Sequence, residues 1–175
     1  LDEISDQAKE IGAVNTICFD NQRKIGYNTD FFGFSKSLEI NEINNIDSVL
    51  ILGSGGAAKT ISYFCNNNNI PYNIVSRNPS NSYISYKSLN EKHFIKKVLI
   101  VNCTPIGTFP DIDRCPDLPY NLINKENVIF DLVYNPSETL LMKKGKERGC
   151  KTINGHEMLR FQAEKSLELW AETFK

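Results

Sequence analysis

Short apolar runs alternate with longer helical patterns over most of the chain after residue 47. The apolar runs lie at 49–52, 72–75, 98–101, 128–133 and 151–153. Between them, the apolar positions of 57–65 and 138–148 recur at helical spacing. Strands that are apolar on both faces and separated by helices are typical of a parallel sheet with βαβ crossovers. We therefore predict an α/β fold built on a doubly wound parallel sheet.

The two ends of the chain follow other patterns. A polar segment at 41–47 is expected to be a linker, and residues 157–174 predict an amphipathic closing helix. The segments 79–94 and 109–121 are too irregular to assign. Before the linker we expect a helix over 5–11 with Ser5 as N-cap, strands over 14–19 and 25–28, and a helix over 30–39 capped by Thr29.

Composition excludes several classes of protein. Twenty Lys and Arg against twenty-one Asp and Glu give a net charge of −1 over 175 residues, without the basic excess expected of a nucleic-acid-binding domain. The apolar runs are far shorter than the roughly 20 residues of a membrane helix, so we expect a cytoplasmic protein with no membrane partner. Five scattered cysteines predict reduced thiols, and two histidines remote from any cysteine argue against a metal site.

A glycine-rich turn follows the apolar run at 49–52 directly. The segment Gly53-Ser54-Gly55-Gly56-Ala57-Ala58 matches G-x-G-x-x-A between a predicted strand and a predicted helix, which is the context of a dinucleotide-binding fingerprint. The free N–H groups at the helix start would face the pyrophosphate of the cofactor. The alternative is a simple glycine-rich turn between a strand and a helix.

The end of the next strand bears on the choice of cofactor. An NAD site usually carries a carboxylate there, whereas this chain has Ser76-Arg77-Asn78. A guanidinium can bind a 2′-phosphate through two parallel hydrogen bonds, which favours NADP. An exposed arginine at a strand end with no ligand is the alternative.

Several further motifs occur along the chain besides the glycine turn. They are Ala13-Val14-Asn15-Thr16, Gly26-Tyr27-Asn28-Thr29-Asp30 with Gly33-Phe34, Asn102-Cys103-Thr104-Pro105-Ile106-Gly107, Asp131-Leu132-Val133-Tyr134-Asn135-Pro136 with Thr139, and Asn154-Gly155 with Met158-Leu159 and Gln162-Ala163. In their order and approximate spacing, over nearly the whole chain, these motifs resemble the shikimate dehydrogenase family.

The resemblance implies an NADP-dependent oxidoreductase that interconverts shikimate and 3-dehydroshikimate in aromatic amino-acid biosynthesis. It implies a remnant of an α/β substrate domain with a hinge at 1–32, a Rossmann-like NADP domain at 33–154, and a C-terminal helix at 155–175 that packs back on the substrate domain. The implied substrate contacts are Asn15, Asp30, Tyr134 and Gln162, with Asp30 also catalytic. The implied cofactor contacts are Gly53, Ser54, Gly55, Gly56, Ala57, Ser76, Arg77, Asn78, Asn102, Thr104, Leu132 and Gly155.

Each of these residues also has an ordinary structural interpretation. Asn15, Asp30 and Gln162 offer the hydrogen-bond donors and acceptors that a small polyol needs. Considered one at a time, they are equally consistent with a turn residue, a neighbour of an N-cap and an exposed amide on a helix, in that order. Asn102 and Thr104 follow a strand at the edge where open α/β sheets bind ligands, but the Thr-Pro-Ile-Gly segment could equally be a rigid loop. The combined pattern favours the functional interpretation.

One departure from the family pattern concerns the catalytic base. The resemblance implies a lysine in an Asn-Val-Thr-x-Pro-x-Lys segment, which this sequence lacks, and neither Lys9 nor Lys24 stands in such a motif. The chain opens on Leu1 rather than on methionine, so we expect a longer natural protein that carries the lysine upstream. The alternatives are a non-catalytic NADP-binding module and a quinate/shikimate dehydrogenase with relaxed cofactor choice.

Overall fold

The computed structural model describes residues 1–80 and 82–173. Within them, the larger sheet has six strands, all parallel, in the order β6-β5-β4-β7-β8-β9. The order reverses between β4 and β7, the arrangement that leaves a crevice for ligands at the carboxyl ends of the strands. The strands are β4 (Ser48–Leu52), β5 (Tyr72–Val75), β6 (Tyr83–Ile84), β7 (Val98–Asn102), β8 (Val128–Asp131) and β9 (Lys151–Asn154). The α/β prediction with a doubly wound parallel sheet is confirmed.

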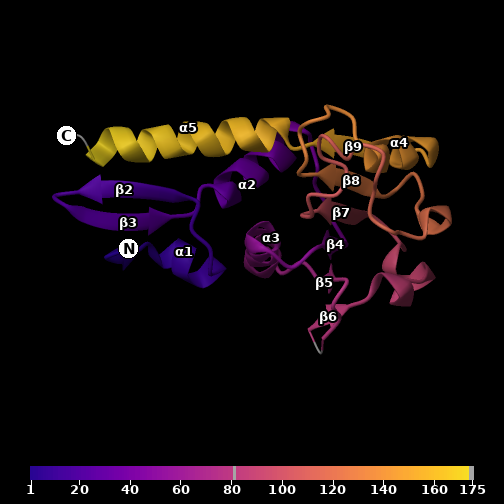
Figure 1. The fold of residues 1–175 in the computed structure, drawn as a ribbon. Coiled ribbons are helices and arrows are strands. Elements are labelled where there is room, and N and C mark those ends of the chain that lie inside the picture. The colour runs from indigo at the N-terminus through magenta and orange to yellow at the C-terminus, as the bar shows by residue number, and fades with distance from the viewer. Residues whose placement is uncertain (81, 174–175) are drawn as a thin grey trace.

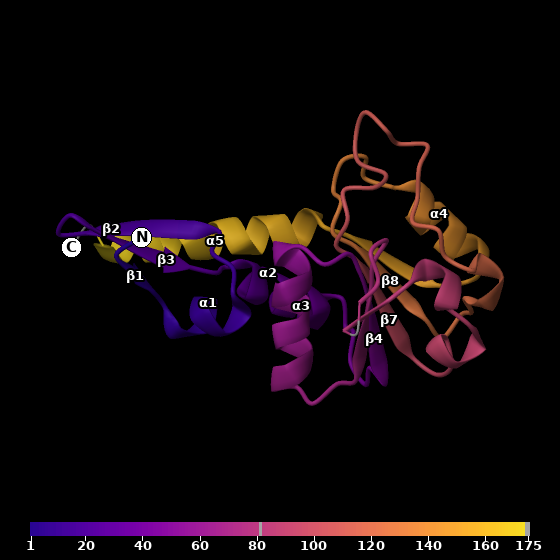
Figure 2. The ribbon, with the colours of Figure 1, turned by 60° about the horizontal axis from the view of Figure 1, so that its bottom comes forward.

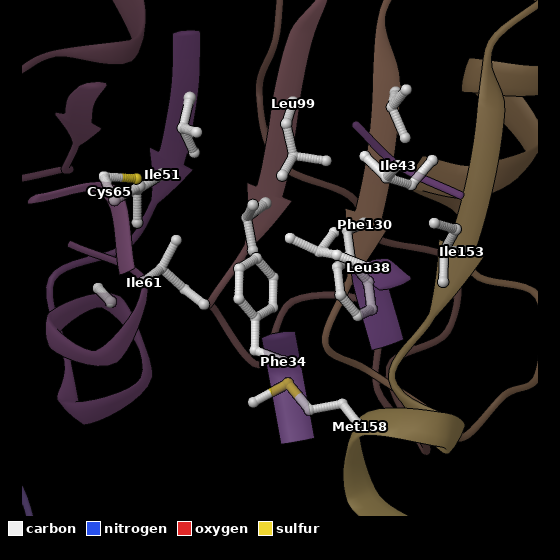
Figure 3. Packing of buried hydrophobic residues seen from close by; sticks show 14 residues of the cluster. Phe34, Leu38, Ile43, Ile51, Ile61, Cys65, Leu99, Phe130, Ile153 and Met158 are labelled. Carbon is white, nitrogen blue, oxygen red and sulfur yellow. The ribbon is translucent and has the colours of Figure 1, made fainter. Parts of the chain in front are cut away.

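Helices cover both faces of this sheet, α3 (Gly56–Asn67) on one and α4 (Leu140–Glu147) on the other (Figure 2). The helices α2 (Asp30–Ile40) and α5 (His156–Thr173) pack on the face that α3 covers. Figure 3 shows Phe34 and Leu38 of α2 and Met158 of α5 against Phe130 of β8. Phe34 and Phe130 are fully buried, with ring centroids 5.2 Å apart, so α2 is fixed firmly to the sheet.

A second, smaller sheet lies beside the first (Figure 1). It consists of β1 (Glu3–Ile4), β2 (Thr16–Asp20) and β3 (Arg23–Tyr27) in the order β1-β3-β2, with α1 (Asp6–Ile11) packed nearby. The long helix α5 starts at the six-stranded sheet and runs across to β2, so it connects the two sheets. None of the helices in the described ranges is long and apolar enough to span a bilayer.

The structure corrects several details of the sequence prediction. Thr29 precedes α2, but its hydroxyl makes no capping bond to the helix, because it is engaged in a buried cluster described below. The unassigned segment 79–94 contains β6 and two short 3₁₀ turns, and β8 ends at Asp131 because the carboxylate there accepts the Val133 N–H (3.1 Å). The strand β1 gave no periodic signal, since it has two residues. Residue 174, the predicted end of the closing helix, lies outside the described residues.

Candidate functional site

A cleft of about 530 Å³ opens at the carboxyl ends of β4, β5 and β7, beside the reversal in strand order. Ligands of open α/β sheets bind at such reversals. Among the lining residues are seven of the predicted cofactor contacts: Gly53, Ser54, Gly55, Ser76, Arg77, Asn78 and Thr104. The structure therefore brings the glycine turn, the end of β5 and the loop after β7 together around one space.

The glycine turn joins β4 to α3 in a conformation that suits an anion. Gly53 has φ +103°, and a Cβ on it would lie 3.0 Å from Cγ2 of Thr104, so a side chain is excluded there. Gly55 is the N-cap of α3 and provides no side-chain cap, while a Cβ on it would meet no atom within 4 Å. The first N–H groups of the helix are thus left facing open space, where a phosphate can accept them.

The end of β5 forms one wall of the cleft. The Ser76 hydroxyl accepts the N–H of Asn78 (3.2 Å), which turns the chain and leaves the side chain of Arg77 exposed at the cleft. Tyr86 lines the same wall. Burial raises the pKa of the Tyr86 phenol, Arg77 lowers it and Asp117 raises it, so both charged side chains act on this phenol.

A buried polar network supports the loop after β7. Asn102 is fully buried; its Oδ1 accepts the N–H (3.1 Å) and hydroxyl (2.6 Å) of Thr104, and its Nδ2 donates to Asp131 (2.8 Å). Asp131 also accepts from the Thr139 hydroxyl (2.6 Å). Burial raises the pKa of the Asp131 carboxyl, although these hydrogen bonds oppose the shift. Asn102 and Asp131 hold Thr104 against the cleft and do not line it themselves.

A second group of predicted residues meets where α2, α5 and the loop before β2 converge. Oδ1 of Asn15 accepts the backbone N–H of Thr29 (2.9 Å) and its hydroxyl (3.2 Å), while Oε1 of Gln162 lies 3.2 Å from the same hydroxyl. Because Oδ1 of Asn15 is held by a backbone donor, its amide NH₂ is free to donate to Asp30. Burial raises the pKa of the Asp30 carboxyl, and the hydrogen bond from Asn15 partly opposes this. Asn15, Asp30 and Gln162 are thus brought together.

Two buried hydroxyls behind this group were not predicted as site residues. The hydroxyl of Ser166 on α5 lies 2.7 Å from that of Thr16 on β2 and 3.0 Å from that of Thr29 before α2. Thr16, Thr29 and Ser166 are 3%, 1% and 4% exposed, so the cluster is sealed from water. The sequence does place Ser166 in the apolar stripe of α5. Because a hydroxyl on a buried helix face needs a hydrogen-bond partner, this position could have indicated a buried polar contact.

The remaining predicted residues lie between or beside these two groups. Gly56 and Ala57 open the first turn of α3. A Cβ on Gly155 would lie 2.1 Å from the carbonyl oxygen of Leu132, so only glycine permits this contact between the ends of β8 and β9. Tyr134 is 51% exposed on the loop after β8, and within the described chain it has no hydrogen-bond partner that ties it to Asn15 or Asp30.

The sequence reasoning missed much of the cleft wall formed by the loop after β7. Thr108, Phe109, Asp111 and Arg114 line the cleft, although the irregular sequence of this loop gave no basis for placing them. In the parts of the chain that the structure describes, no group of three or more His, Cys, Asp or Glu side chains is placed to hold a metal ion.

Comparisons with known proteins agree on one family, although no family model matches the chain. A shikimate dehydrogenase (NADP(+)) of Clostridium beijerinckii is 42% identical over 180 residues, which cover 98% of this chain and 66% of that protein. The shikimate dehydrogenase (NADP(+)) of Clostridium botulinum is 41% identical over 97% of this chain and 69% of its own length. The crystal structure of shikimate 5-dehydrogenase from Thermus thermophilus, in complex with NADP(H) and shikimate, matches with a TM-score of 0.85 at 31% identity, over 97% of this chain and 66% of that one. The chain thus spans about two thirds of the length of these relatives.

Proposed function

The chain belongs to the shikimate dehydrogenase family, and from this premise we propose that it forms the NADP-binding part and one wall of the substrate site of an enzyme that reversibly reduces 3-dehydroshikimate to shikimate. The match to the Thermus thermophilus structure, whose bound molecules are NADP(H) and shikimate, carries the proposal, because it extends over 97% of the chain. The activity is proposed for the complete polypeptide.

The cleft fits a dinucleotide in shape and in charge. Gly55 leaves open space beside the first N–H groups of α3, where the pyrophosphate would bind. Arg77, with Ser76 and Asn78, would hold the 2′-phosphate at the end of β5, since a guanidinium matches the geometry of phosphate oxygens. Thr104 would lie against the cofactor, with buried Asn102 fixing its position.

The chemistry that we assign to this chain is orientation of the substrate and handling of its hydroxyl proton. When bound, the nicotinamide exchanges a hydride with the carbon that carries the reacting hydroxyl. Asn15, Asp30 and Gln162 would bind the substrate hydroxyls, and Tyr134 would lie between substrate and nicotinamide. Burial raises the pKa of the Asp30 carboxyl toward neutral pH. A carboxyl with a raised pKa is suited to share a proton with a hydroxyl and a neighbouring base.

The proposal is tested in two steps. Titration of the 175-residue chain with NADP⁺ by calorimetry should give a dissociation constant, and the complete polypeptide should reduce NADP⁺ with shikimate, followed by absorbance at 340 nm. A complete polypeptide that binds both compounds but leaves NADP⁺ unreduced from neutral to alkaline pH would overturn the proposed activity.

A second candidate is a non-catalytic NADP-binding module, which would use the same cleft without turning over a substrate. The coding sequence upstream of residue 1 discriminates between the two, since an Asn-Val-Thr-x-Pro-x-Lys segment there supports the enzyme. For the related alternative of a quinate/shikimate dehydrogenase with relaxed cofactor choice, kcat/KM for NADP⁺ and NAD⁺ is compared before and after Arg77→Ala. Equal values in the parent would contradict the role of Arg77.

A further inference from the structure

The cleft holds a second arginine besides the one in the segment at the end of β5. Of the described residues that line it, Arg77 and Arg114 are the cationic ones and Asp111 is the carboxylate. Both arginines are exposed, and neither forms an ion pair with any residue in the ranges 1–80 and 82–173. Two guanidinium groups are therefore available to a ligand in the cleft.

Arg114 lies on the loop after β7 and lines the same cleft as the residues at the end of β5. This loop projects beyond the sheet in Figure 2 and then doubles back, since a Cβ on Gly107 would lie 2.9 Å from the carbonyl oxygen of Arg114. Its outgoing part is fixed by Asn135, whose carbonyl oxygen accepts the N–H of Phe109 (3.0 Å) and the hydroxyl of Thr108 (3.2 Å). The backbone of Arg114 thus passes close to Gly107, at the fixed base of the loop.

The returning part of the loop approaches the side of the cleft that holds Arg77. Three residues after Arg114, the carboxylate of Asp117 raises the pKa of the Tyr86 phenol, whereas Arg77 lowers it, so both charges lie near this phenol, which also lines the cleft. Leu118 then enters the core at 5% exposure. The phenol of Tyr86 therefore marks where the loop from β7 and the end of β5 come together, at the 2′-phosphate end of the proposed cofactor site.

We infer that Arg114 supplies a second guanidinium to the 2′-phosphate of NADP, facing Arg77 across the cleft, and so contributes to the choice of NADP over NAD. A phosphate monoester carries a charge of about −1.5 to −2 at neutral pH, which one guanidinium does not balance. Two guanidinium groups provide both the charge and paired N–H donors. This inference rests on the proposed function, because it assumes that NADP is the ligand.

The experiment compares cofactor affinities of Arg114→Gln, Arg77→Gln and the parent chain by calorimetry with NADP⁺, NAD⁺ and 2′,5′-ADP. Arg114→Gln should weaken binding of NADP⁺ and 2′,5′-ADP by about 10- to 100-fold, while the affinity for NAD⁺ changes less than about twofold. Arg114→Lys, which keeps the charge but loses the planar fork, should give an intermediate loss. Arg23→Gln on β3 removes an equal charge far from the cleft and should leave all three affinities unchanged.

Three other results of these titrations would each overturn a different part of the inference. Equal weakening of NADP⁺ and NAD⁺ binding would move the contact to the pyrophosphate and overturn the 2′-phosphate assignment. Unchanged affinity for NADP⁺ in Arg114→Gln, with the parent binding normally, would overturn the role of Arg114 alone. A parent chain that binds none of the three ligands would overturn the proposed function together with this inference.

Discussion

Asp30 combines an unfavourable environment with a proposed chemical role. It is the first residue of α2, where a negative charge is stabilised by the helix dipole, yet burial raises its pKa in the folded chain. A carboxyl whose pKa is higher in the folded than in the unfolded state costs stability above the folded-state pKa. The cost shrinks as pH falls and disappears below the unfolded-state pKa of about 4. Asp30 therefore destabilises the fold at neutral pH.

We expect Asp30→Asn to stabilise the chain near pH 7, because the amide keeps an acceptor for Asn15 and removes the buried charge. The midpoint of thermal unfolding should rise by roughly 1–3 °C, and the difference from the parent should vanish toward pH 4. Unfolding is followed by circular dichroism between pH 4 and 8. The exposed Asp113→Asn serves as control and should shift the midpoint little. A lower midpoint for Asp30→Asn at pH 7 would contradict this argument.

The same substitution separates chemistry from cofactor binding in the complete polypeptide. Asp30→Asn should lower kcat by about 10²-fold or more, while the dissociation constant of NADP⁺, measured by calorimetry, stays within about twofold. Cofactor binding should be little affected because Asp30 belongs to the group around Thr29 and does not line the cleft at the glycine turn. An unchanged kcat would remove Asp30 from the proton transfer.

At the scale of elements, the buried hydroxyl cluster joins β2, α2 and α5 at one point. Thr29 has a single hydroxyl proton but two amide oxygens, of Asn15 and Gln162, each 3.2 Å away. Asn15 keeps the backbone N–H of Thr29 as a donor in either case, so the orientation of Gln162 depends more strongly on this hydroxyl. The cluster thus links the packing of α5 to a proposed substrate contact.

Thr29→Val removes the hydroxyl at nearly constant volume and should destabilise the chain by about 1–3 kcal/mol, because buried oxygens lose their donor. Thr29→Ser keeps the hydroxyl and should recover most of this loss. Urea unfolding followed by tryptophan fluorescence measures both variants, since Trp170 on α5 reports on the junction. A valine variant as stable as the parent, with a less stable serine variant, would mean that the methyl group, and not the hydroxyl, is what the cluster requires.

The sequence predicted elements where periodicity or a motif was strong and missed those held by contacts distant in sequence. The apolar runs at β4, β7 and β8 are buried on both faces, so their pattern reports directly on the parallel sheet. The strand β1 pairs with β3, about 20 residues away, and two residues are too few to show a period. For the same reason β6 was not recognised within the irregular segment.

In the candidate site, too, residues specified by a local motif were predicted, and residues placed by contacts distant in sequence were not. The glycine turn and Arg77 were predictable because one local motif specifies the backbone, and the structure brings both to the cleft. The location of Arg114 depends on a loop that returns to Gly107, and no local pattern specifies that return. The buried hydroxyl of Ser166 meets Thr16 across 150 positions of sequence, so only the folded chain reveals the pair.

For the whole molecule, the six-stranded sheet has a hydrophobic core on each face, and within the described chain the small sheet contributes no residue to either core. The helix α5 connects the two sheets. Its first turn packs on the core of the six-stranded sheet through Met158, which is 7% exposed. Its far end contacts β2, where the indole N–H of Trp170 donates to the carbonyl oxygen of Ile17 (2.8 Å). Local opening of the small sheet should therefore be possible without unfolding the cofactor cleft.

Trp170→Ala tests this separation, because it removes the contact at the far end of α5 and leaves the six-stranded sheet untouched. Hydrogen exchange followed by mass spectrometry should become faster in β2 and β3, while β4, β7 and β8 keep the protection of the parent and the affinity for NADP⁺ changes less than about twofold. Leu167→Ala is the matched control, since Leu167 is 61% exposed on the same helix and should leave exchange nearly unchanged. Faster exchange of equal size in both sheets would show that α5 couples them into one cooperative unit, and the cofactor cleft would then depend on the integrity of the small sheet.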